Sequence, residues 1–133
     1  LQDQGLIQHV GLSNVTVEQL DRASDVADIT TVQNRYNVGN RQHEPVLEAC
    51  ENRDVGFIPW CPIGGGGLAE RRDDLEAVAA NHDATVRQIA LAWLLQYSDV
   101  VLPIPGTSSI DHLEENLATA DLELSEDAMA RLS

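Results

Sequence analysis

The chain has 133 residues, and its hydrophobic content of 43% is enough for a packed core and too high for wholesale disorder. It carries 22 acidic against 8 basic residues, a formal charge of −14, and every basic residue is arginine. Such a surface repels nucleic acid and anionic membranes, since neither offers positive charge to Asp and Glu. We interpret the charge as the solvated surface of a halophilic protein, with an acidic interaction surface as the alternative.

Targeting and redox signals are few. We see neither a long apolar run typical of a membrane span nor the basic and apolar regions of a signal peptide. Cys50 and Cys61 are too few and too widely spaced for a disulfide framework or a zinc site. We therefore expect a reduced, cytoplasmic setting. The first residue is Leu1, so we expect a fragment of a longer product or a processed start.

The first predicted unit is a strand that ends at Ser13 and Asn14, followed by a helix. Thr16 and Gln19 have the spacing of a capping box, and Val17, Leu20, Ala23 and Val26 recur at helical spacing. A hydroxyl and an amide at a strand end can hold the carboxamide or hydroxyl of a ligand. The alternative is that both residues form a turn and help to cap the helix.

The second unit is a short strand at Thr31 to Gln33, and Glu44-Pro45 opens the helix that follows it. A buried Gln33 must find hydrogen-bond partners, and at a strand end the partner can be a ligand amide. A satisfied polar residue in the interior of a barrel is an equally good explanation.

The third strand is predicted at Gly56 to Trp60, and a glycine run at Gly64 to Gly67 follows it. An indole at a strand end can stack on a planar heterocycle, and glycine lets the backbone approach phosphate closely. The alternative is an ordinary surface rim. The glycines do not form a P-loop, because no Gly-Lys-Ser/Thr follows them. Two helices are predicted next, at Asp73 to Asn81 and Thr85 to Gln96.

The fourth strand is predicted at Val100 to Ile104, which is apolar at nearly every position, as in a strand buried on both faces. Between this strand and the next helix, Gly106 to Ser109 offer backbone amides and hydroxyls that favour an anion site. Ordinary helix capping by Ser109 is the alternative. That helix bears Ile110, Leu113 and Leu117, and a last short helix ends at Leu132.

Strands that alternate with helices predict an α/β fold with parallel βαβ units. The carboxyl ends of all four strands would then lie on one face and line one site. We find no linker or domain boundary and treat residues 1–133 as one unit. Four βα units fall short of the eight in a complete barrel of ~250 residues, which indicates half of a larger fold.

Several motifs together resemble the aldo-keto reductase family: Gly11-Leu12-Ser13-Asn14, Gln33-Asn34-Arg35-Tyr36-Asn37, Pro59-Trp60-Cys61-Pro62-Ile63-Gly64, and Ile104 to Ser108 with Glu115-Asn116. The resemblance covers essentially the whole chain and the C-terminal half of the family's (β/α)8 TIM barrel, strands five to eight. It implies a nicotinamide cofactor, NADP or NAD. The residues it assigns to the cofactor are Ser13, Asn14 and Gln33 (carboxamide), Trp60 (ring stacking), Cys61, Ile63 and Gly65 (pyrophosphate loop), and Gly106, Thr107, Ser108, His112, Glu115 and Asn116 (adenosine and its 2′-phosphate).

The chain departs from the family pattern at the 2′-phosphate positions. Many members have Lys at the position of Gly106 and Arg at that of His112, so the choice between NADPH and NADH stays open. Trp60 replaces a commoner Tyr and retains the stacking surface. The family's catalytic Tyr, Asp, Lys and His lie in the N-terminal half. This chain contains no Lys, and we assign no catalytic residue to it.

The resemblance thus implies a parent protein that reduces aldehydes or ketones with NAD(P)H, this chain supplying the cofactor half of the site. Its expected partners are the cofactor, a small carbonyl substrate, and the missing N-terminal half or a second copy to cover open sheet edges. Two alternatives remain: a non-catalytic cofactor-binding or regulatory half-barrel, and an inactive truncated product.

Overall fold

The computed structural model describes residues 1–64 and 67–133 and contains a three-stranded parallel sheet in the order β1-β2-β3. The strands are β1 (Val10–Ser13), β2 (Ile29–Arg35) and β3 (Gly56–Trp60). The helices are α1 (Val17–Ser24), α2 (Glu44–Glu51), α3 (Gly67–Glu70), α4 (Arg72–His82), α5 (Val86–Tyr97), α6 (Ile110–Ala118) and α7 (Glu126–Leu132), with a 3-10 turn, η1, at Thr119–Asp121. Within the described residues, no helix is long and apolar enough to cross a membrane.

Local signals explain where the helices begin. Thr16 and Gln19 form the predicted capping box of α1: the Thr16 amide donates to Gln19 Oε1 (2.9 Å), and the Gln19 amide donates to Thr16 Oγ1 (3.3 Å). Thr85 and Gln88 repeat the arrangement at α5. Both predictions are confirmed, and β3 has its predicted bounds.

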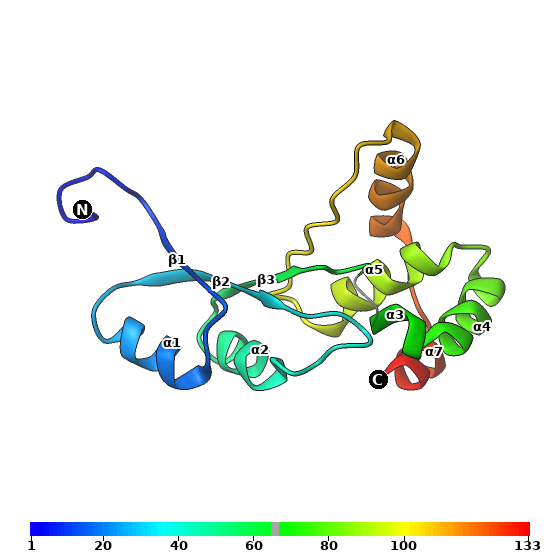
Figure 1. Cartoon of the computed structure of the whole chain (residues 1–133), viewed down its shortest axis with the longest axis horizontal. Coiled ribbons are helices and arrows are strands. Elements are labelled where there is room, and N and C mark those ends of the chain that lie inside the picture. Colours follow the sequence, from blue (N-terminus) through cyan, green and yellow to red (C-terminus); the bar gives the residue numbers. More distant parts are fainter. Residues whose placement is uncertain (65–66) are drawn as a thin grey trace.

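Buried and more exposed residues alternate along the strands, so the two faces of the sheet differ in how well they are covered. Val32, Asn34 and Phe57 are buried beneath the helices, with α1 and α2 on the same side of the sheet (Figure 1). The opposite face is only partly covered, and the register aligns Gly11, Thr31 and Gly56 across it. A Cβ added at Gly11 would lie 2.5 Å from Thr31 Oγ1, so glycine is needed for this side chain to fit.

The prediction of a fourth strand at Val100 to Ile104 is wrong, because the segment does not form a full strand. Residues 100–104 meet β3 through one parallel bridge, in which the Phe57 amide donates to the Val100 carbonyl (2.7 Å) and the Leu102 amide to the Phe57 carbonyl (2.8 Å). Pro103 and Pro105 have no amide hydrogen with which to continue the ladder. Leu102 is 56% exposed, so this segment is not buried on both faces.

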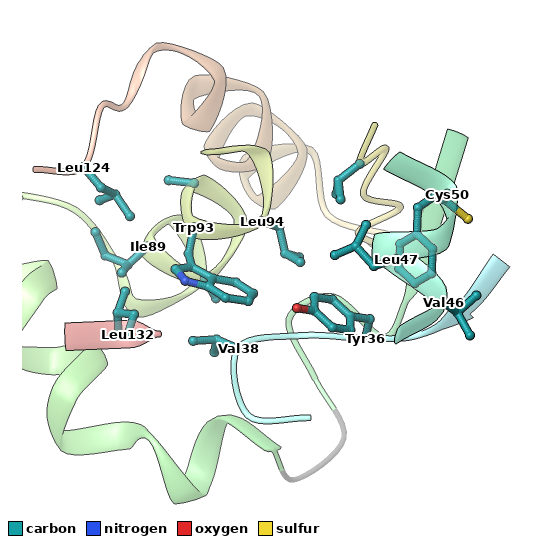
Figure 2. Packing of buried hydrophobic residues seen from close by; sticks show 14 of the residues in the cluster. Tyr36, Val38, Val46, Leu47, Cys50, Ile89, Trp93, Leu94, Leu124 and Leu132 are labelled. Carbon is teal, nitrogen blue, oxygen red and sulfur yellow. The ribbon is translucent and has the colours of Figure 1, made fainter. Parts of the chain in front are cut away.

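The hydrophobic core is centred on α5. Residues Ile89 to Leu94 of this helix are all buried, and Trp93 is fully enclosed. The Trp93 ring stacks on Tyr36 from the end of β2, with centroids 6.1 Å apart and an interplanar angle of 19°. Figure 2 shows Leu132 of α7 and Val38 beside the same indole. The core therefore joins the strand half of the chain to its C-terminal helices.

Helix α6 is an exception to this packing. It stands away from the sheet, rests on α5 and η1, and has no buried residue (Figure 1). Its apolar residues Ile110 and Leu117 are 74% and 67% exposed. The apolar residues of α6 are therefore left largely uncovered by the described part of the chain, although a helix with an apolar face is stable in water chiefly when that face is covered.

One carboxylate links β2 and α5. Glu44, at the start of α2, accepts hydrogen bonds from the hydroxyls of Tyr36 (2.7 Å) and Tyr97 (2.6 Å). Burial, followed by the hydrogen bond to Glu44, raises the pKa of Tyr36 far above its usual 10.0. Burial likewise raises the pKa of the Cys50 thiol from 9.0 to about 11. Folding thus favours the neutral forms of both groups.

We expect the free energy of unfolding to fall as the pH rises through 9 to 11. A group whose pKa is raised by folding contributes full stability below its unfolded pKa and loses that contribution above it. For Tyr36 the loss reaches about 1 kcal/mol at pH 11, one unit above its unfolded value. Urea denaturation at pH 8 to 11 checks this: Tyr36→Phe should lose less stability over this range than the wild type. Equal losses would contradict the assignment, and Cys50→Ala separates the thiol's share.

Candidate functional site

Three strand ends bring polar and aromatic side chains together at the carboxyl edge of the sheet. Ser13 of β1 pairs in register with Gln33 of β2, and β3 ends at Trp60. The indole Nε1 of Trp60 donates a hydrogen bond to Asn14 Oδ1 (2.9 Å), and Asn14 Nδ2 donates to Ser13 Oγ (3.1 Å). The structure therefore joins Ser13, Asn14 and Trp60 directly and places Gln33 in the neighbouring row.

The turn after β1 fixes the Asn14 side chain. Asn14 has φ 55°, in the left-handed region that Asn tolerates better than most residues, and its amide donates to the Gln33 carbonyl (2.9 Å). The next residue is clamped by Asn34, whose Oδ1 accepts from the Val15 amide (3.0 Å) and whose Nδ2 donates to the Val15 carbonyl (2.7 Å). Asn14 therefore forms part of a turn, as the alternative explanation predicts. The residue that caps α1 is Thr16 rather than Ser13 or Asn14.

Asn14 keeps hydrogen-bonding capacity for a ligand. An amide oxygen accepts two hydrogen bonds and an amide nitrogen donates two. Trp60 uses one acceptor position of the amide oxygen, and Ser13 uses one donor position of the amide nitrogen. Within the part of the chain that the structure describes, one acceptor and one donor position remain, which matches the needs of a carboxamide.

Arg35, for which no role was predicted from the sequence, also belongs to this group. It pairs in register with Trp60 across β2 and β3, and its guanidinium carbon lies 5.7 Å from the centroid of the indole ring. Such a distance is within the range of a cation–π contact. The signal that finds it is alternation: Gln33 and Arg35 are two residues apart and therefore share a face of the strand.

The loop after β3 begins with a constrained backbone. Cys61 has φ 60°, and its carbonyl accepts a hydrogen bond from Asn37 Nδ2 (2.9 Å). Ile63 is partly buried and packs against the core. These contacts anchor the start of the loop that was expected to cover a pyrophosphate. Gly65, assigned to the same loop, lies outside the described residues.

The remaining predicted residues form a second group on α6 and the loop before it. Gly106, Thr107, Ser108 and His112 are exposed. Thr107 Oγ1 accepts from the Ser109 amide (3.1 Å), and Ser109 Oγ accepts from the His112 amide (3.4 Å), so the capping role of Ser109 is confirmed. Glu115 accepts a hydrogen bond from the hydroxyl of Thr85 at the start of α5. This group is separate from the three strand ends, because α6 packs on α5 rather than on the sheet.

Asn116 marks a recess between α5 and α6. Its Oδ1 and Nδ2 are both buried without a hydrogen-bond partner among the described residues. The side chain lines a largely apolar cavity of about 310 Å³, with Leu91, Leu95, Pro103, Pro105, Leu113, Leu117 and Thr119. A buried amide without partners is costly unless a ligand or water satisfies it. The recess therefore suits a flat heterocycle with its own donors and acceptors.

The described residues offer little for acid–base or metal chemistry. They contain no group of three or more His, Cys, Asp or Glu placed to hold a metal ion. Tyr36 is buried and donates to Glu44, and its raised pKa makes it a poor proton donor. The arrangement can bind and orient a planar, amide-bearing ligand.

Comparison with known proteins identifies the class. Residues 1–133 match the aldo/keto reductase family, and the chain belongs to it. It is 48% identical over 132 residues to an uncharacterised oxidoreductase of Schizosaccharomyces pombe and 44% identical over 132 residues to pyridoxine 4-dehydrogenase of Escherichia coli. Each match covers 99% of this chain but only 43% and 46% of the relative. The chain thus spans about half the length of these relatives.

Solved structures agree with the fold. A thermostable aldo-keto reductase in complex with epalrestat superposes with a TM-score of 0.87 at 34% identity, covering 98% of this chain and 49% of the other. An aldo/keto reductase from Klebsiella pneumoniae in complex with NADP and acetate superposes with a TM-score of 0.85 at 29% identity, covering 99% and 49%. The chain has the α/β fold of the C-terminal half of a (β/α)8 barrel, as predicted.

Proposed function

We propose that the chain is the cofactor-binding half of an enzyme that reduces aldehydes or ketones with NADPH or NADH. The observation that carries the proposal is the arrangement at the strand ends, where Asn14 accepts a 2.9 Å hydrogen bond from the Trp60 indole. Among the described residues, Asn14 keeps one donor and one acceptor position without a partner. The NADP-bound Klebsiella relative supports the same class of ligand.

The residues present fit a nicotinamide group. The indole of Trp60 supplies a flat surface for stacking, and Ser13, Asn14 and Gln33 offer polar atoms beside it for a carboxamide. When bound, the cofactor supplies the hydride, and the part of this chain is to bind and orient the ring.

The recess at Asn116 fits an adenine edge, since its unpartnered amide both donates and accepts. The surrounding charge is less suited to a 2′-phosphate. Residues 104–116 contain Asp111, Glu114 and Glu115 and no Lys or Arg. The proposal therefore covers both NADPH and NADH.

We propose that the catalytic acid comes from outside this chain, from the N-terminal half of the parent protein. The chain has no Lys to lower the pKa of a tyrosine. The same half would cover the open face of the sheet and the exposed apolar residues of α6, as would a second copy in a dimer. The two free thiols, Cys50 and Cys61, suit the cytoplasm we propose as its compartment.

Titration of the purified chain with NADPH and NADH tests the proposal. We expect binding by calorimetry, weakened about tenfold or more in Trp60→Ala, because an aromatic stacking surface is lost. Trp60→Phe is the matched control, since it keeps a flat ring, and it should retain most of the affinity. Failure of the wild type to bind either nucleotide would overturn the proposal.

A second measurement tests whether this chain binds the cofactor while the N-terminal half supplies the catalytic acid. The chain alone should show no NAD(P)H-dependent carbonyl reduction, and turnover that disappears in Trp60→Ala would contradict this expectation. The coding sequence upstream of Leu1 should carry an in-frame extension with Asp, Tyr, Lys and His. A stop codon directly upstream would instead favour a stand-alone binding module or an inactive product.

A further inference from the structure

The contact between Arg35 and Trp60 places a positive charge on one side of the candidate site. The guanidinium carbon lies 5.7 Å from the centroid of the indole, and the two residues are neighbours in the register of β2 and β3. The edge of the same indole is held by Asn14 through its Nε1. Arg35 thus lies over one face of the ring, so a planar ligand that stacks on this indole would use the opposite face.

The two redox forms of nicotinamide differ in charge. The oxidised ring carries a positive charge and the reduced ring is neutral, while the remainder of the dinucleotide is unchanged. A cation–π contact draws on the negative potential of the aromatic face, so a second cation on the other face of the same ring is less well stabilised. Arginine is protonated at every physiological pH, so this effect is permanent.

We propose that Arg35 is a specificity-determining residue that makes the site bind reduced nicotinamide cofactors more tightly than oxidised ones. This inference rests on the proposed function, since it requires the nicotinamide to stack on Trp60. Two unit charges on opposite faces of one ring, partly screened by solvent, correspond to about a three- to tenfold change in affinity. The same cation favours loading of the reduced cofactor and departure of the oxidised one.

The test compares the ratio of dissociation constants for oxidised and reduced nucleotide. We would measure it by calorimetry for the NAD⁺/NADH and NADP⁺/NADPH pairs, so that the 2′-phosphate cancels within each pair. In Arg35→Gln the ratio should fall about three- to tenfold relative to the wild type. In Arg35→Lys, which retains the charge, most of the ratio should remain. Circular dichroism of each variant confirms that it is folded.

Arg22→Gln provides the matched control. Arg22 is exposed in the last turn of α1, which runs back from the carboxyl end of β1 toward the amino end of β2, so its loss changes the net charge away from the indole. Its ratio should equal that of the wild type. An unchanged ratio in Arg35→Gln, with nucleotide still bound, overturns this inference and leaves the proposed function standing. Absence of nucleotide binding by the wild type overturns both.

Discussion

Replacing Trp93 by alanine is expected to lower the free energy of unfolding by about 3–5 kcal/mol, because truncating a buried tryptophan removes apolar burial and leaves a cavity. Trp93 is fully buried in α5. It stacks on Tyr36, contacts Tyr97 at 4.5 Å between ring centroids, and carries the Arg41 guanidinium carbon 4.6 Å from its ring centroid. One substitution therefore removes contacts with the segment between β2 and α2 and with the last turn of α5.

Urea denaturation followed by far-UV circular dichroism measures this loss. Trp60→Ala is the matched control, because it makes the same change at a partly exposed site and should cost far less than Trp93→Ala. Similar losses in the two variants would show that Trp93 does not join the strand half to the C-terminal helices.

Most of the fold could be predicted because its signals are local. The capping boxes at Thr16 and Thr85 fix where α1 and α5 begin, and they depend only on residues three apart. The apolar run between turn residues fixes β3. The strand β2, predicted at residues 31–33, extends from Ile29 to Arg35, because pairing with strands on both sides lengthens it beyond its apolar centre.

The parts that could not be predicted depend on partners distant in sequence. The apolar segment at Val100 to Ile104 has the composition of a buried strand, yet its prolines and its single bridge to β3 leave it mostly outside the sheet. The apolar face of α6 has the right periodicity for packing, but periodicity does not say what covers it.

In the candidate site, too, the residues marked by local signals could be predicted, and the contacts between residues distant in sequence could not. Ser13, Asn14, Gln33 and Trp60 could be selected because each ends a strand, and parallel strands end at one edge. Alternation places Arg35 on the same face of β2 as Gln33, but its contact with Trp60 could not be predicted, because it depends on the register between β2 and β3. The hydrogen bonds of Tyr36 and Tyr97 to Glu44 depend in the same way on how α2 and α5 meet.

The surface charge leads to the remaining prediction, which concerns salt. The formal charge is −14, and four surface ion pairs in the described part of the chain neutralise only a few of the 22 acidic residues. Repulsion among the others opposes the compact state. The Debye length falls from about 10 Å at 0.1 M salt to about 3 Å at 1 M, so added salt should relieve this repulsion.

We therefore expect the free energy of unfolding to rise by on the order of 2 kcal/mol between 0.1 M and 2 M KCl. Salt also weakens the four ion pairs, but exposed pairs contribute at most about 1 kcal/mol each, so relief of the net repulsion should dominate. Potassium chloride is preferred to sulfate, because strongly excluded salts stabilise most proteins regardless of charge.

A charge-reduced variant separates screening from a general salt effect. Glu51, Glu114 and Glu123 are exposed, and changing all three to Gln lowers the negative charge with little change in side-chain size. Its unfolding free energy should exceed that of the wild type at 0.1 M KCl and rise less on addition of salt. If the wild type is instead insensitive to salt, the acidic residues are not an adaptation to molar salt, and an acidic surface for a basic partner becomes the better explanation.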